Sequence, residues 1–261
     1  MNIGIFDSGI GGMTLLHQAM VSLPKENYIF YADTDHVPYG TKTKEQVTGY
    51  VDEVMQFMIA HDCKAVVIAC NTATSVAAGI MRSKYNIPII GIEPAVKPAV
   101  EKSDGKRVMV VATPLTIKEE KLKNLVEKVD DSHLVDLLAL PRLVPFAEAG
   151  EFDSDEVISY LKEMLEPYPM EEYGELVLGC THFNYFKDSF AKLLPAGVKM
   201  IDGSLGTINQ LKRILEQRGL LEENEGIVRY FMSGRQVETK KDLQRMELLH
   251  ERLERMRKIS E

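Results

Sequence analysis

The sequence contains few cysteines: only Cys63, Cys70 and Cys180 occur in 261 residues. Their odd number and their spacing match neither a disulfide framework nor the paired Cys-x-x-Cys arrangement of a structural metal site. A reducing compartment is the simplest environment for such thiols. We therefore expect a cytoplasmic protein.

Long apolar runs and strongly basic segments are also missing. No stretch approaches the ~18 consecutive apolar residues of a membrane span, so no membrane association is expected. An apolar pattern begins at Ile3 without a basic region or a cleavage-site pattern, and we expect no secretory signal. The formal net charge of −8 argues against a nucleic-acid partner and fits a protein that acts on small molecules.

The order of apolar segments predicts the fold class. With 45% hydrophobic residues the chain can bury a sizeable core. Short apolar runs alternate with segments of helical period (11–23, 43–61 and 113–129), which is typical of βαβ units and a parallel sheet. Strands are expected near residues 2–6, 28–32, 65–70, 88–92, 107–112, 134–138, 175–179 and 198–201.

The motifs repeat between the two halves of the chain. "NIGIFDSGIGG" and "VVIACNTATS" in the first half correspond to "RVMVVATPLT" and "ELVLGCTHFN" in the second. Residues 91–107 lie between them and contain two prolines and two glycines, as a crossing between domains often does. We predict an α/β protein of two similar doubly wound parallel-sheet domains that face each other across a central cleft. The first covers residues 1–95, completed by the C-terminal segment 205–261, and the second covers 96–204.

The last segment, residues 237–261, predicts an amphipathic helix. Its apolar residues recur at three- and four-residue steps with charges between them: Leu243, Met246, Leu249, Leu253 and Met256. A helix packed on the protein is the favoured interpretation, with its basic residues on the solvated face. A dimer contact is the alternative.

Two of the cysteines follow predicted strands in similar surroundings. Cys70 precedes Asn71 and Thr72, which are typical N-cap residues, and Cys180 precedes a threonine and a histidine. Parallel sheets bind ligands at the carboxyl ends of their strands, and helix N-termini there favour thiolates and bind carboxylates. Cys63 lacks such neighbours and is assigned to the core.

Two thiols at equivalent places in facing halves suggest two bases flanking one cleft. Such a pair can invert a carbon centre, because one base removes a proton from one face while an acid returns a proton to the other. A thiol can serve in both roles, since its unperturbed pKa of ~8.5 lies near neutral pH. Asp7 could assist Cys70. His182, oriented by an acid such as Glu148, could assist Cys180.

The same motifs resemble a known family. "FDSGIGG", "VPYGTKT", "ACNTAT", "ATPLT", "LVPFAE" and "GCTHF" look like the ordered signature set of the glutamate racemases and cover the chain to about residue 205. "RYFMSG" at 229–234 resembles the family's tail. The sequence departs from the pattern at Asn184, where proline is frequent, at Ala112, where glycine is common, and beyond residue 235.

The resemblance implies an isomerase that interconverts L- and D-glutamate without a cofactor or a metal and supplies D-glutamate for bacterial peptidoglycan. By similarity, Cys70 would take the α-proton from D-glutamate and Cys180 that from L-glutamate. Asp7 would assist the first thiol, and Glu148 with His182 the second. A homodimer is expected, as is common in the family.

Further residues match family positions that line the substrate site: Ser8, Pro38, Tyr39, Gly40, Asn71, Thr72, Thr113, Thr116 and Thr181. Neutral donors and helix N-termini of this kind can hold carboxylates without an arginine.

Three alternatives stay open from the sequence. An aspartate racemase, or another amino-acid racemase of the wider group, would use the same chemistry in a pocket of different shape. A zinc hydrolase could use Cys70, Cys180 and His182 as ligands, although paired ligands at regular spacing are missing. A two-lobed amino-acid-binding module would keep both thiols as core residues.

Overall fold

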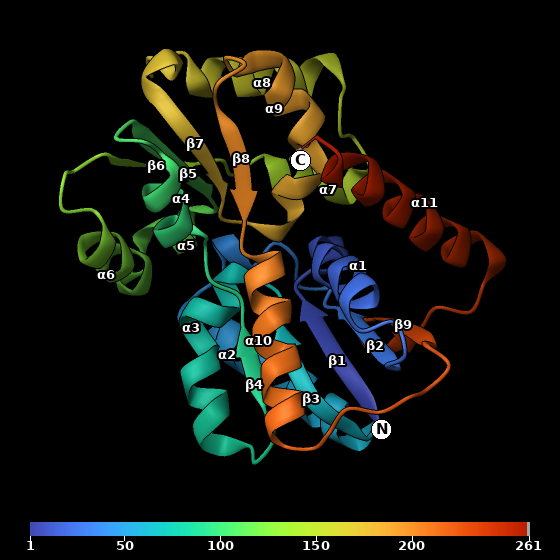
Figure 1. The fold of residues 1–261 in the computed structure, drawn as a ribbon. Helices are drawn as coiled ribbons and strands as arrows, with labels where there is room; N and C mark the ends of the chain where they lie inside the picture. Colours follow the sequence, from blue (N-terminus) through green and yellow to red (C-terminus); the bar gives the residue numbers. More distant parts are fainter. Residues whose placement is uncertain (260–261) are drawn as a thin grey trace.

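The fold was analysed in a computed structural model that describes residues 1–259. Its strands, in chain order, are β1 (Asn2–Asp7), β2 (Tyr28–Ala32), β3 (Cys63–Ile68), β4 (Ile89–Gly91), β5 (Arg107–Ala112), β6 (Val135–Ala139), β7 (Tyr173–Leu178), β8 (Lys199–Asp202), β9 (Val228–Met232) and β10 (Arg235–Gln236). They form two sheets, with the orders β10-β9-β2-β1-β3-β4 and β6-β5-β7-β8 (Figure 1).

The helices connect and cover these strands. The α-helices are α1 (Met13–Ser22), α2 (Lys44–Ala60), α3 (Asn71–Lys84), α4 (Val96–Lys102), α5 (Pro114–Lys118), α6 (Glu120–Val129), α7 (Leu143–Ala149), α8 (Asp155–Leu165), α9 (Lys187–Leu193), α10 (Ser204–Gln217) and α11 (Lys240–Arg257). The 3₁₀ helices are η1 (Ile10–Gly12), η2 (Tyr39–Thr41), η3 (Met170–Glu172) and η4 (Thr181–Phe186).

Both sheets are covered on both faces, which confirms the predicted α/β class. In the first sheet, α1 and α10 pack on one face and α2 and α3 on the other. In the second, α4 and α6 cover one face, and α7 to α9 cover the other. The pairing is parallel except between β9 and β10. Strands such as β3 and β7 are buried along their whole length and are mainly apolar, apart from Lys64 and Glu175.

Each sheet with its covering helices is called a lobe below. The chain passes from the first lobe to the second between β4 and α4, and it returns between β8 and α10, which packs on β4 and α1. The strands of the two sheets point toward each other in Figure 1. The predicted domain boundaries, at 95/96 and 204/205, remain a proposal. The division of the strands between the two sheets supports it.

The structure differs from the sequence prediction in two additional strands and in one helix that is broken in two. Strands β9 and β10 were not predicted, because β9 lies toward the sheet edge, is half-exposed and shows no continuous apolar run. The helix predicted over 113–129 is broken at Glu119, whose backbone is extended. This break separates α5, at the cleft, from α6 and lets the buried Glu119 carboxylate pair with Lys44 (Nζ–Oε2 3.1 Å).

The C-terminal helix α11 packs against α1 and η4 and so contacts both lobes. Met246, Leu249, Leu253 and Met256 are buried as predicted, whereas Leu243 is 38% exposed because it lies in the first turn, ahead of this contact. The expectation that the basic residues face solvent is wrong for Arg252. Its side chain is 7% exposed and is held by hydrogen bonds and an ion pair. Residues 260 and 261 of this predicted helix lie outside the described residues.

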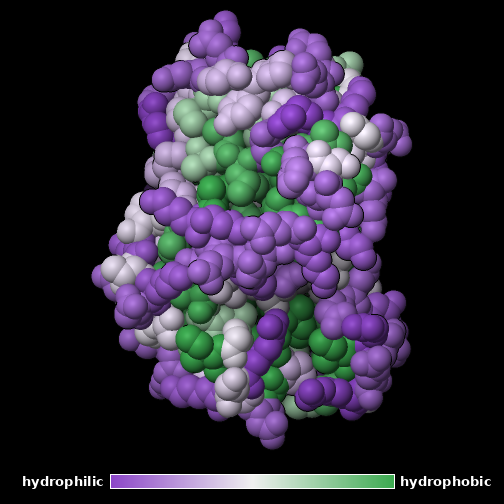
Figure 2. All heavy atoms as spheres, turned by 90° about the vertical axis from the view of Figure 1, so that its left-hand side faces the viewer, coloured by the Kyte–Doolittle hydropathy of each residue, from purple (hydrophilic) through white to green (hydrophobic). Residues whose placement is uncertain are grey.

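The surface is largely hydrophilic across the middle of the face shown in Figure 2, and hydrophobic side chains gather above and below that band. Within residues 1–259, none of the helices combines the length and the apolar character that a bilayer crossing requires.

The two connections between the lobes touch at Gly203. A Cβ atom there would lie 2.2 Å from the main-chain oxygen of Glu93. We expect Gly203→Ala to lower the free energy of unfolding by about 1–3 kcal/mol, as overpacking typically does. Gly206, three residues on in α10, has open space at its Cβ position. Gly206→Ala should therefore stabilise the protein by about 0.5–1 kcal/mol. Urea unfolding of both variants checks the opposite signs; equal effects would contradict the packing argument.

Candidate active site

The site lies between the lobes, at the carboxyl ends of central strands from both sheets. Asp7 is the last residue of β1, and Cys70 follows β3 by two positions. In the second lobe, Thr113 follows β5 directly and Cys180 follows β7 by two positions. Open parallel sheets bind ligands at this edge.

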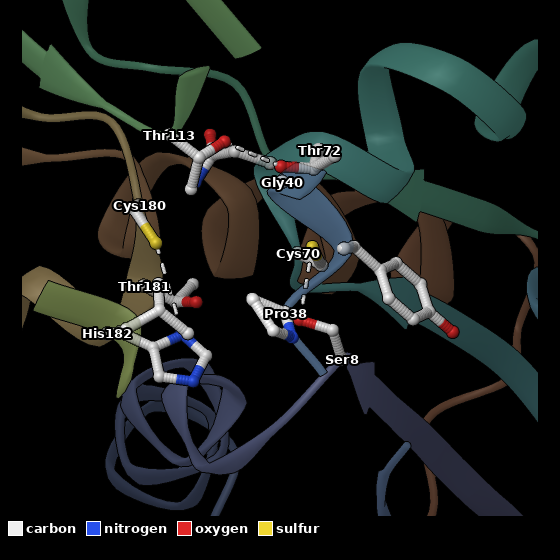
Figure 3. A pocket seen from close by; sticks show the side chains of 12 residues that line it. Ser8, Pro38, Gly40, Cys70, Thr72, Thr113, Cys180, Thr181 and His182 are labelled. Carbon is white, nitrogen blue, oxygen red and sulfur yellow. Dashed lines mark hydrogen bonds between the residues drawn. The ribbon is translucent and has the colours of Figure 1, made fainter. Parts of the chain in front are cut away.

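A small, narrow cavity lies between these strand ends. Figure 3 shows Cys180 and His182 on one side of it and Cys70 and Ser8 on the other. Its wall is formed by Ser8, Pro38, Tyr39, Gly40, Cys70, Asn71, Thr72, Thr113, Val144, Cys180, Thr181 and His182. Of the predicted site residues, Asp7, Glu148 and Thr116 lie behind this wall. Val144 was not predicted, although it lies within the "LVPFAE" motif.

Cys70 is linked to Asp7 through a hydroxyl group. The Cys70 sulfur lies 3.7 Å from Ser8 Oγ, which donates to Asp7 Oδ1 at 3.1 Å. The sulfur also accepts the Ala73 N–H at the start of α3 (3.4 Å). Burial and the nearby Asp7 carboxylate raise the pKa of Cys70 well above its ordinary value. The thiol form is therefore favoured in this structure, and its thiolate would be a strong base.

Cys180 belongs to a cysteine–histidine–glutamate chain. Its sulfur lies 3.9 Å from His182 Nδ1, and His182 Nε2 lies 2.7 Å from Glu148 Oε1. The Gly11 N–H also points at Nε2 from 3.3 Å, but the 2.7 Å contact with the Glu148 carboxylate is much shorter and assigns a proton to Nε2. Nδ1 is then the atom that can exchange a proton with the thiol. Burial alone would lower the pKa of His182, but the contacts with Cys180 and Glu148 outweigh burial and raise that pKa well above its ordinary value.

The two carboxylates have opposite shifts. Burial raises the pKa of Asp7 despite the opposing effects of His182 and of hydrogen bonds from Thr181 and Ser8. For Glu148, burial alone would raise the pKa, but the hydrogen bond and charge of His182 lead the interactions that lower it. Glu148 thus stays ionised beside a protonated imidazole.

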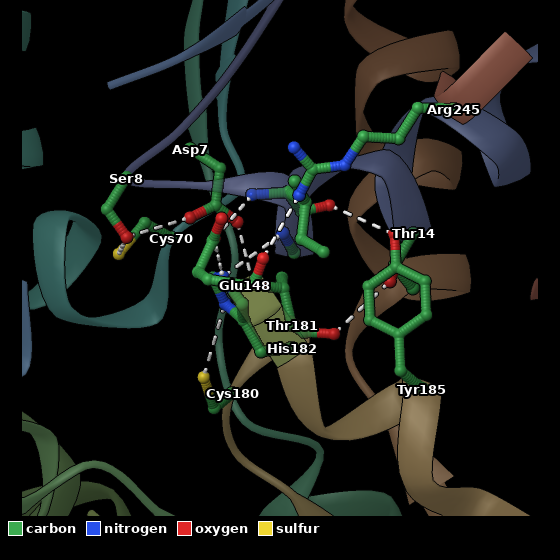
Figure 4. Close-up of polar contacts among 12 residues, drawn as sticks. Asp7, Ser8, Thr14, Cys70, Glu148, Cys180, Thr181, His182, Tyr185 and Arg245 are labelled. Carbon is green, nitrogen blue, oxygen red and sulfur yellow. Dashed lines mark hydrogen bonds and ion pairs between the residues drawn. The ribbon is translucent and has the colours of Figure 1, made fainter. Parts of the chain in front are cut away.

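Hydrogen bonds between the lobes hold both assemblies (Figure 4). Thr181 Oγ1, from the second lobe, donates to Asp7 Oδ2 at 2.6 Å. In the other direction, the Ile10 N–H of the first lobe donates to Glu148 Oε1 at 2.8 Å. Tyr185 adds a bond from its hydroxyl to the Ile10 carbonyl (3.1 Å). Each lobe therefore helps to position an acidic residue of the other.

Neutral polar groups complete the cavity. The hydroxyl oxygens of Thr72, in the first lobe, and of Thr113 and Thr116, in the second, lie 3.0 Å from one another. They form a further set of hydrogen bonds between the lobes. Asn71 is 4% exposed, and neither of its amide atoms has a protein partner. Unpaired buried polar groups are costly, so this amide is available to a polar group that enters the cavity. The residues lining this cavity, all within the described chain, include no lysine or arginine.

Sequence reasoning missed the residue that anchors the loop before η2. Asp33 accepts a hydrogen bond from the Tyr39 hydroxyl at 2.6 Å and one from the Ser233 hydroxyl at 3.1 Å. His36 Nδ1 also lies 2.9 Å from this carboxylate. Ser233 lies within the "RYFMSG" motif. This motif was the available signal for a role of the segment, but it gave no indication that Asp33 is the partner of Ser233.

The described part of the chain contains no set of ligands suited to a metal site. Among residues 1–259, no three His, Cys, Asp or Glu side chains are arranged to hold a metal ion. The zinc-hydrolase alternative therefore gains no support from the geometry.

Fold and site together define a two-lobed α/β protein with paired free cysteines in its cleft. A family model described as Asp/Glu/Hydantoin racemase matches residues 13–211. A glutamate racemase of Lachnospira eligens is 55% identical over 99% of this chain and 100% of its own length.

Solved structures agree with the family match. The glutamate racemase of Francisella tularensis, in complex with D-glutamate, has a TM-score of 0.80 at 30% identity and covers 96% of this chain and 93% of its own. That of Escherichia coli, in complex with L-glutamate and the activator UDP-MurNAc-Ala, has a TM-score of 0.77 at 29% identity and covers 82% of each chain. The chain belongs to the Asp/Glu/hydantoin racemase family and within it to the glutamate racemases, so it is an isomerase.

The contact between His182 and Glu148 makes a prediction about proton affinity. Glu148→Gln removes the negative charge that stabilises the imidazolium, so the pKa of His182 should fall. NMR titration of the histidine rings measures this change. Glu254→Gln is the control, because Glu254 contacts His17 instead (3.0 Å). An unchanged His182 titration in Glu148→Gln would contradict the assigned pair.

Proposed function

We propose that this protein interconverts L- and D-glutamate by direct proton transfer between the substrate α-carbon and two cysteines, without a cofactor. The observation that carries the proposal is the presence of two free thiols in one cavity, each with its own proton-transfer partners. Two bases on opposite faces of a carbon atom are what a racemisation through a planar carbanion requires.

In the direction from D- to L-glutamate, the Cys70 thiolate removes the α-proton and becomes a thiol. The Cys180 thiol then gives its proton to the opposite face of the carbanion and becomes a thiolate. The reverse reaction exchanges the two roles, so protons balance in each direction. Asp7, through Ser8, assists Cys70, and His182 with Glu148 assists Cys180.

Substrate binding is assigned to the neutral groups around the cavity. Asn71 offers an unpaired amide, and Ser8, Thr72, Thr113 and Thr181 offer hydroxyls. The N-terminus of α3 supplies main-chain N–H groups beside Cys70 for a carboxylate. Glutamate is favoured over aspartate because two solved relatives were crystallised with L- or D-glutamate. In addition, a relative named as a glutamate racemase aligns with 99% of this chain.

The proposal extends to the cellular role that the resemblance implies. D-glutamate made here would enter peptidoglycan, and the protein would act as a homodimer in the cytoplasm, where its thiols stay reduced. Sedimentation of the purified protein reports the oligomeric state directly.

The two-thiol mechanism is tested by α-deuteration and circular dichroism of L- and D-glutamate in D₂O, with a chelator present and no pyridoxal phosphate added. We expect the wild type to remove optical activity and to introduce deuterium at the α-carbon. Cys70→Ser and Cys180→Ser should each lower the rate by about 10²–10⁴-fold, because a serine hydroxyl is a poor base at neutral pH. Cys63→Ala is the matched control and should retain activity, since Cys63 lies in the core beside Met58.

Different outcomes separate the alternatives. Exchange of aspartate but not glutamate would keep the chemistry and overturn the substrate. Racemisation that survives in both active-site serine variants would overturn the two-thiol mechanism. If the wild type exchanges neither amino acid, a binding module becomes the better description.

A further inference from the structure

Helix α11 directs two arginines at the second lobe from one face. Arg245 and Arg252 are seven residues apart, about two helical turns, so they lie on the same side of the helix. Each donates to a main-chain carbonyl. Arg245 Nη2 lies 3.0 Å from the Glu148 oxygen, and Arg252 Nε and Nη2 lie 3.0 and 2.7 Å from the Tyr185 oxygen.

Both carbonyls belong to the last turn of a short helical segment. Glu148 is the next-to-last residue of α7, and Tyr185 is the next-to-last residue of η4. The final carbonyls of a helix lack partners within the helix and carry partial negative charge. A guanidinium at this position satisfies the acceptor and favours the helical turn.

These two segments carry the residues that serve Cys180. The Glu148 side chain extends from the turn that Arg245 holds, and η4 also contains His182. Figure 4 shows Arg245 reaching from its helix toward Glu148, which lies beside His182 and Cys180. In the first lobe, described hydrogen bonds of His250 and Glu254 of α11 go to His17 of α1, and not to Asp7, Ser8 or Cys70.

The arginines differ in how firmly they are anchored. Arg252 is 7% exposed, pairs with both Asp188 oxygens at 2.9 Å and stacks over Phe152 at 4.6 Å. Arg245 is exposed, and its hydrogen bond is the one to the Glu148 carbonyl. Removal of Arg245 should therefore cost little stability, whereas removal of Arg252 would leave Asp188 without its partner.

We propose that Arg245 and Arg252 are positioning residues for the Cys180 half of the reaction, acting by fixing the main chain that carries Glu148 and His182. Neither touches the cavity. The inference rests on the proposed racemase function. It gives a role to a helix that lies beyond residues 13–211, the part of the chain that the family model matches.

The proposal predicts an effect on one of two proton transfers. L- and D-glutamate have equal free energies, so kcat/KM must stay equal in the two directions whatever the variant. Weaker positioning of His182 raises the barrier of the Cys180 step alone. The deuterium isotope effect on kcat/KM should then increase for α-deuterated L-glutamate, whose proton Cys180 removes, and decrease for α-deuterated D-glutamate.

The test uses the full-length protein with Arg245→Met, Arg245→Lys and the matched control Arg255→Met, an exposed position on the same helix. Arg245→Met should lower kcat roughly three- to tenfold with KM changed less than about twofold, because positioning errors act mainly on the transition state. Arg245→Lys should recover most of the loss, since its ammonium can reach the same carbonyl. Arg252→Lys should shift the isotope effects in the same direction.

The outcomes separate this inference from the function on which it rests. Failure of the wild type to racemise glutamate would remove the proposed function. An active wild type with Arg245→Met equal to Arg255→Met would overturn the positioning role alone. A loss of rate in Arg245→Met with equal changes of both isotope effects, or with a lowered melting temperature that explains it, would also overturn it, because it would indicate general damage.

Discussion

The site depends on close contact between two turns, one from each lobe. Thr181 donates to Asp7, and the Ile10 N–H donates to Glu148, so each lobe positions an acidic group of the other. Only a residue without a side chain fits beside this contact, since a Cβ atom at Gly9 would lie 1.9 Å from Glu148 Oε1. These hydrogen bonds therefore exist only when the lobes adjoin.

Contact between the lobes also explains the electrostatics. Asp7 and His182 are almost fully buried, where an isolated charge would be very unfavourable. Burial raises the pKa of Asp7, while hydrogen bonds with Cys180 and Glu148 keep His182 protonated. Because these groups are buried away from water, the pKa of each depends strongly on its neighbours. If the lobes separated, these shifts would diminish, so the pKa values belong to the assembled cleft rather than to either lobe.

The sequence predicted the parts of this structure that depend on local patterns. Eight strands, the helix N-terminus at Cys70 and the paired thiols could be predicted directly, because short apolar runs and N-cap chemistry leave regular signals. The half-exposed β9 left no apolar run. The hydrogen bonds that join Asp7 to Thr181 and Asp33 to Ser233 connect residues 174 and 200 positions apart, and no local pattern encodes such pairs. The burial of Arg252 escaped prediction for the same reason, since a basic residue on an amphipathic helix is usually solvated.

The two halves of the cleft are similar in topology but unequal in support. Cys70 reaches its carboxylate through a neighbouring hydroxyl, whereas Cys180 relies on an imidazole and a glutamate whose main chain is held by a third element. A racemase cannot use such inequality to favour one product, because its substrates have equal free energy. In the proposed two-thiol mechanism, the inequality can change only the relative heights of the two proton-transfer barriers. Burial and the Asp7 carboxylate raise the pKa of Cys70 and favour its thiol form, whereas the partner that lies beside the Cys180 sulfur is the imidazole of His182.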